Sequence, residues 1–151
     1  MADPKQLAKV LELADKELEK AQLQLRSARS QADALREQLK QLQAYRFDYV
    51  KQADEKAGNL VAANHYQQYY HFIAKLDGAI NDQHTQIHAA DEAVVQFQQH
   101  WQLIQQKQKA LALLIDKEHQ RRAARAEKRE QSELDEFAIQ QYLRSRAQRM
   151  A

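Results

Sequence analysis

The sequence lacks the residues that most small domains use for covalent links and tight turns. It has no cysteine, which excludes disulfide bonds and thiol catalysis and fits a reducing compartment. Its two glycines and one proline leave little material for turns. No run of about 18 apolar residues is present, and the first residues lack a secretory signal's apolar stretch. We therefore expect a cytoplasmic protein without direct membrane insertion.

Charge of one sign is also scarce, because the net charge is only +2. Residues 1–115 carry 14 basic and 14 acidic side chains, and residues 116–151 carry 9 and 7. The excess therefore lies near the C-terminus, where acids interleave with the bases. Interleaved acids oppose phosphate contacts, so no nucleic-acid partner is predicted.

Helix-forming residues dominate, and apolar residues recur with the alternating four- and three-residue spacing of a coiled coil. The first seam runs from Leu7 to Ala53 and is broken only by Arg46. The second seam runs from Tyr66 to Ile115, includes the polar Gln83, and stops at Glu118. Two sustained seams indicate two long helices.

The two seams have nearly equal lengths, so we predict an all-α fold: a long two-helix antiparallel coiled-coil hairpin with a C-terminal helical extension. In it, residue i lies opposite a residue numbered about 119 minus i. A single domain (1–151) would contain helix one (about 4–57, capped by Asp3), a turn (about 58–63, closed by Gly58 and Asn59) and helix two. Helix two would begin near Asn64, pair over 64–115, and continue as an unpaired overhang, residues 116–148.

Catalytic and metal-binding patterns are absent from the sequence. There is no glycine-rich phosphate loop, nucleophile elbow or H-E-x-x-H motif. His84 and His88 have the i, i+4 spacing of a two-histidine metal site, but they lie off the seam without a third ligand nearby. We predict no enzyme activity, no metal and no cofactor.

Aromatic residues crowd the expected turn end of the hairpin. Tyr45, Phe47, Tyr70 and Phe72 exceed what a two-stranded seam can bury. Such a surplus indicates a protein-binding patch, or else a small cap that wraps the loop. Gly78 lies beside this region, where it costs about 1 kcal/mol relative to alanine and could permit close approach or slight bending.

The overhang combines a basic stripe with apolar residues that have no intramolecular partner in this register. A partner protein could supply the missing surface, or the segment could be a frayed tail, because isolated helices are marginal in water. The basic stripe could bind phosphate backbones or an acidic protein surface, or it could be a solvated helix face. The residues concerned are Lys117, Arg121, Arg122, Arg125, Lys128, Arg129, Leu134, Phe137, Ile139, Tyr142 and Leu143.

Two motifs resemble the flagellar export protein FliJ family. Residues 65–80, HYQQYYHFIAKLDGAI, are similar to its YQQFIxxLxxAI segment, and residues 134–138, LDEFA, match a late motif. The resemblance covers essentially the whole chain. It implies a hairpin similar to the rotor stalk of rotary ATPases, in the cytoplasm at the inner-membrane base of the flagellum.

The resemblance also implies partners: the flagellar export ATPase hexamer and its regulator, the cytosolic domain of the export gate, and empty export chaperones. The overhang, through Arg121, Arg122, Arg125, Lys128, Arg129, Leu134 and Phe137, would meet the ATPase. The family's gate-binding stripe corresponds here to Gln38, Leu42, Tyr45, Tyr49, Phe72, Leu76 and Ala79. The next residue of that stripe is histidine in the family, whereas this chain has Gln83 followed by His84.

The function expected from these features is a stalk that links the ATPase ring to the gate and escorts chaperones, as an elongated monomer. One alternative is the corresponding stalk of a virulence type III secretion system. Another is a generic coiled-coil scaffold, which would form a parallel dimer instead.

Overall fold

Two long helices account for nearly all of the computed structural model, which describes residues 3–57 and 63–150. Helix α1 spans Pro4–Ala57 and helix α2 spans Ala63–Met150. No strand occurs in these two ranges. The predicted all-α hairpin is confirmed. The proposed turn residues 58–62, including Gly58 and Asn59, lie outside the described residues.

Helix α1 begins at the predicted cap. The backbone N–H of Lys5 donates to Asp3 Oδ1 at 3.3 Å, and the N–H of Leu7 donates to the Asp3 carbonyl at 3.0 Å. Asp3 thus satisfies N–H groups that have no partner within the helix, while Pro4 occupies the first helical position, where no donor is needed.

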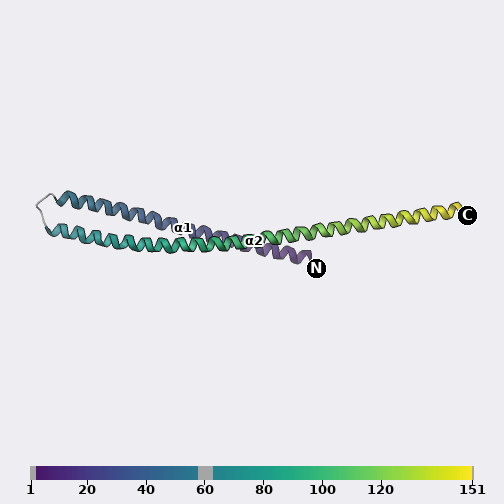
Figure 1. Ribbon diagram of the computed structural model, residues 1–151, viewed down its shortest axis with the longest axis horizontal. Helices are drawn as coiled ribbons and strands as arrows, with labels where there is room; N and C mark the ends of the chain where they lie inside the picture. Colours follow the sequence, from purple (N-terminus) through teal and green to yellow (C-terminus); the bar gives the residue numbers. More distant parts are fainter. Residues whose placement is uncertain (1–2, 58–62, 151) are drawn as a thin grey trace. The chain divides into compact units, whose positions relative to one another are not determined.

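The chain divides into two compact units, and both helices contribute to each. The larger unit is Asp15–Gln105, in which α1 and α2 run side by side in opposite directions (Figure 1). The smaller unit joins Met1–Ala14 to Gln106–Ala151.

The core of the larger unit consists of seam residues. Small side chains of α1 and bulky ones of α2 are both buried there: Ala21 and Ala32 are each only 1% exposed, and Ile104 is also buried. Burial of this apolar surface is the main stabilising contribution to the pairing. The buried residues of this unit are Ala21, Leu25, Ala28, Ala32, Ala53, Ile73, Leu76, Gln83 and Ile104.

Cross-helix contacts confirm the predicted register. Gln83 Nε2 donates to the Leu35 carbonyl at 2.9 Å and to Gln38 Oε1 at 3.1 Å, close to the expected partner position of about 36. The ring of Tyr49 stacks on that of Phe72, with centroids 4.5 Å apart. Gln83 is buried in the seam, and these bonds satisfy its amide N–H group.

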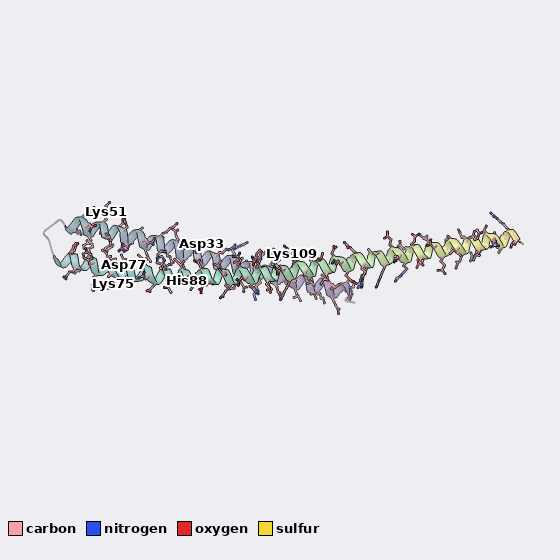
Figure 2. The ribbon with its side chains drawn as sticks, in the orientation of Figure 1. Asp33, Lys51, Lys75, Asp77, His88 and Lys109 are labelled. Carbon is pink, nitrogen blue, oxygen red and sulfur yellow. The ribbon has the colours of Figure 1, made fainter. Side chains whose placement is uncertain are left out.

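Arg46, which interrupts the first seam, forms a cross-helix ion pair. Its Nε donates to Asp77 Oδ1, and its Nη2 lies 3.5 Å from Asp77 Oδ2. Figure 2 labels Asp77 on α2, in the stretch beside α1. Both side chains keep about half of their surface in water, so screening makes this pair a weak contributor to stability.

The smaller unit is packed only over part of its length. Ile115 is its buried residue, and Leu7, Leu11 and Leu111 are partly buried. Every described residue from 123 to 150 is exposed. Figure 2 shows side chains that project above and below this last part of α2, where the ribbon changes from green to yellow. The overhang therefore forms a helix whose side chains contact few other groups of the chain.

Gly78 does not serve close packing. A Cβ atom added there meets no atom within 4 Å, and the residue is exposed in the middle of α2. The suggestion that glycine allows close approach of the two helices is therefore wrong.

We expect Gly78→Ala to raise the free energy of unfolding by about 0.5–1 kcal/mol, since alanine loses less backbone entropy in a helix. Urea unfolding followed by circular dichroism at 222 nm measures this change. Ala79→Gly, at the neighbouring exposed position, is the matched control and should lower the free energy of unfolding by a similar amount. An unstable Gly78→Ala variant would mean that the helix needs glycine there.

Candidate protein-binding surfaces

The residues that the family resemblance implies for binding the export gate lie on both helices of the larger unit. The Tyr45 ring lies 5.1 Å from that of Tyr49 and 6.2 Å from that of Phe72 between centroids. One aromatic cluster therefore joins α1 to α2. The gate patch consists of Gln38, Leu42, Tyr45 and Tyr49 from α1 and Phe72, Leu76 and Ala79 from α2.

The members of the gate patch differ in what they present to solvent. Tyr45 is 49% exposed, whereas Leu76 is only 7% exposed. Phe72 is half-buried, and Ala79 is exposed. Leu76 thus acts mainly by packing, while Tyr45 and Phe72 offer the accessible ring surface.

A groove opens beside Tyr45. It has a volume of about 430 Å³ and is lined by Gln38, Gln41, Leu42, Tyr45 and Gln83. The bond from the Gln83 amide to Gln38 fixes one wall of the groove. A lining of apolar and amide side chains suits an apolar side chain from a partner, with nearby hydrogen-bonding groups to orient it.

Two tyrosines of this region, Tyr49 and Tyr66, have a pKa raised above the usual value. The hydrogen bond with Tyr70, burial and nearby charges all raise the pKa of Tyr66, whose hydroxyl lies 2.8 Å from that of Tyr70. The Tyr45 hydroxyl likewise raises the pKa of Tyr49, with a further contribution from burial. The aromatic cluster combines apolar ring surface with hydroxyl groups that can form hydrogen bonds, which is typical of protein-binding surfaces.

The predicted surplus of aromatic surface is confirmed. Phe47 is 68% exposed and Tyr70 is 53% exposed, although both lie outside the gate patch. Phe47 lines a second groove, of about 350 Å³, together with Gln43, Arg46, Val50, Asp77 and Ile80.

The second set of candidate residues lies on the overhang. The Glu118 carboxylate accepts hydrogen bonds from Arg121 Nη2 at 3.1 Å and Arg122 Nε at 3.4 Å. Burial raises the pKa of Glu118, but the bonds and charges of the two arginines outweigh it and lower the pKa below its usual value. Part of the basic stripe is thus already paired within the chain.

The apolar members of this set are fully available. Leu134 is 63% exposed and Phe137 is 59% exposed, three residues apart on one side of α2. They differ from the gate patch in that all of their neighbours in sequence are exposed as well.

Comparison with known proteins decides the family. The sequence profile described as "Flagellar FliJ protein" matches residues 4–147. The chain belongs to the FliJ family. The flagellar FliJ proteins of Salmonella typhi and of Escherichia coli (strain K12) are each 30% identical to it over 148 residues. Each alignment covers 91% of this chain and 94% of the relative. No solved structure matches.

Membership of the FliJ family confirms the resemblance that the YQQ and DEFA motifs indicated. The family matches span both the gate patch and most of the overhang, so neither surface lies in an unrelated extension.

Sequence reasoning missed Gln41, which lines the groove beside Tyr45. It lies three residues after Gln38 and four before Tyr45, so helical spacing could have indicated it. It also missed the pairing of Arg46 with Asp77, because it treated Arg46 only as a break in the seam.

His88 Nε2 lies 3.2 Å from Glu92 Oε1 on an exposed face. Within residues 3–57 and 63–150, no group of three or more histidine or acidic side chains is arranged to hold a metal ion. Neither described helix has a stretch long and apolar enough to cross a membrane.

Proposed function

We propose that this FliJ-family protein is a non-catalytic component of the flagellar type III export apparatus, a coiled-coil stalk that links the export ATPase ring to the export gate. It acts in the cytoplasm, at the base of the flagellum. The observation that carries the proposal is the aromatic cluster of Tyr45, Tyr49 and Phe72, which joins both helices and stays partly exposed.

Burial supports a binding role for this cluster. A coiled coil needs only its seam to be covered, yet Tyr45 is half exposed beside a groove. Aromatic side chains with an apolar body and a polar tip are the commonest anchors of protein interfaces. The gate patch would therefore bind the cytosolic domain of the export gate.

The overhang supports a second and separate contact. Its exposed Leu134 and Phe137, with the basic side chains before them, offer a helical surface to the ATPase hexamer and its regulator. The interleaved charges favour orientation and rapid association over a tightly locked contact. α2 runs without interruption from Ala63 to Met150, so one helix carries part of each surface.

Chaperone escort is part of the same proposal. The groove lined by Phe47 and Val50 is distinct from the gate patch, and it gives empty export chaperones a surface that gate binding leaves open. A virulence secretion stalk has the same physical requirements, but the flagellar family match favours the flagellar system.

The test is to immobilise the full chain and measure binding of the export ATPase and of the gate's cytosolic domain separately. The proposal predicts saturable binding of both. Loss of either interaction in buffers of moderate ionic strength would contradict the corresponding half of the proposal, and a scaffold unrelated to export would bind neither.

A further inference from the structure

The coiled-coil spacing of α2 resumes near its C-terminal end. After Ile115 the seam positions are charged, including Glu118, Arg122 and Arg129. From residue 132 the same spacing, four and three residues in alternation, selects a mixed set of positions, in which Ile139, Leu143 and Met150 are apolar. We name these positions the distal seam: Ser132, Glu136, Ile139, Leu143, Arg146 and Met150.

The distal seam is uncovered. Ile139 is 59% exposed, Leu143 is 55% exposed and Met150 is 78% exposed. These side chains stand on one side of a continuous helix and have no packing partner among the described residues. Their spacing is that of a helix–helix interface, so a second helix is the surface that fits them.

When two copies of the distal seam run in opposite directions, the residues that meet are complementary in type. Two helices that pair antiparallel about residue 141 place Ile139 of one copy against Leu143 of the other. The same pairing places Glu136 against Arg146, and Ser132 against Met150. All of these contacts occur twice, because a two-fold axis relates the copies. We propose that a second copy of this chain covers the distal seam in this antiparallel arrangement.

Charges beside the seam agree with the same arrangement. Asp135 and Arg149 each lie next to a seam position, and in the antiparallel pair they flank each other across the interface. In the described part of the chain, none of Asp135, Glu136, Arg146 and Arg149 takes part in an ion pair. Each is therefore available to a second copy.

A parallel pair is disfavoured by the same residues. It would bring Glu136 against Glu136 and Arg146 against Arg146, and like charges in direct opposition are repulsive. Within residues 132–150 the acidic side chains precede the basic ones, and this order favours the antiparallel arrangement.

The self-association is weak and leaves the ATPase-facing side chains open. Only Ile139 and Leu143 provide apolar central layers, so the complex forms at high protein concentration. Leu134 and Phe137 lie off the distal seam, on the outer side of the helix. The inference stands apart from the proposed function, since it concerns the chain alone.

The test is sedimentation equilibrium of the full chain between about 10 µM and about 1 mM, a range that detects weak dimers. We expect a monomer–dimer equilibrium. Glu136→Arg and Arg146→Glu should each weaken dimerisation by about tenfold or more, because each places like charges together twice. The double variant restores opposite charges and should return the dissociation constant to within about threefold of the original.

Ile139→Ala and Leu134→Ala form a matched control, since both remove exposed apolar side chains five residues apart. Only Ile139→Ala should weaken the dimer. Circular dichroism checks that helicity is unchanged in each variant. A monomer at every concentration would overturn the inference and leave another protein as the occupant of the seam. A dimer that is indifferent to the charge reversals, or that the double variant fails to restore, would overturn it too.

Discussion

Removal of residues 117–151 is expected to weaken the stimulation of the export ATPase that the proposed stalk contact predicts. Among the residues that the structure describes, Ile115 is the last buried one, so the truncation leaves the buried core residues in place. It removes the basic stripe and the exposed Leu134 and Phe137. Because a few exposed anchors usually carry most of an interface's energy, we expect the concentration needed for activation to rise by at least about tenfold.

The measurement is the rate of ATP hydrolysis by the ATPase hexamer as the chain is titrated. The control is binding of the truncated chain to the gate domain, which should be unchanged because the gate patch lies within the larger unit. The double variant Leu134→Ala, Phe137→Ala tests the apolar part of the overhang without shortening the helix. Full stimulation by the truncated chain would refute the assignment of the overhang to the ATPase.

Tyr45→Ala combined with Phe72→Ala should weaken binding of the gate's cytosolic domain by about 100-fold. The two rings contact each other across the helices, and Tyr45 is half exposed beside a groove. Truncation of two central aromatic anchors is expected to cost about 2.8 kcal/mol in total, and each 1.4 kcal/mol changes affinity about tenfold. Isothermal titration calorimetry with the gate domain measures the change.

The chain provides a closely matched control for this pair. Phe47→Ala with Tyr70→Ala also removes one phenylalanine and one tyrosine, one from each helix, and both side chains are more exposed than Tyr45. We expect less than about a threefold effect on gate binding, because these residues lie outside the gate patch. Thermal unfolding must show that both double variants remain folded. Equal losses in the two variants would mean that the aromatic surface as a whole, and not the gate patch, binds the gate.

The fold could be predicted from the sequence because one repeating pattern specifies it. The Leu and Ala positions of the first seam, and the Ile and Leu positions of the second, supply the buried residues of the hairpin. The equal length of the seams determined the register, and the contacts of Gln83 with Leu35 and Gln38 agree with it. Long periodic segments with few turns leave few alternative topologies.

Details that depend on long polar side chains could not be predicted in the same way. The register places Arg46 opposite a position near residue 73, yet its guanidinium pairs with Asp77, one helical turn further along α2. A flexible arginine can reach an acid at either neighbouring turn, so the seam alone does not choose the partner. The contact of Lys56 Nζ with the Tyr69 hydroxyl, at 2.7 Å, is of the same kind.

The candidate sites could be predicted in part: the sequence indicates which residues share a face, but not how exposed each one is. Helical spacing places Tyr45, Tyr49 and Phe72 on adjoining faces, and their ring contacts agree with that placement. Spacing could not show that Leu76 is buried while Tyr45 is half exposed, because exposure depends on how the partner helix covers each residue. Which protein covers each surface depends on molecules outside the chain.

The central claim is that one chain holds two different partners through separate surfaces. Its most direct test is sedimentation velocity of the full chain mixed with both the export ATPase and the gate's cytosolic domain, each labelled with a different chromophore. The account predicts that both labels migrate with one species that forms only when the chain is present. If the gate domain instead displaces the ATPase from the chain, the two surfaces are not independent and the account of a linking stalk is contradicted.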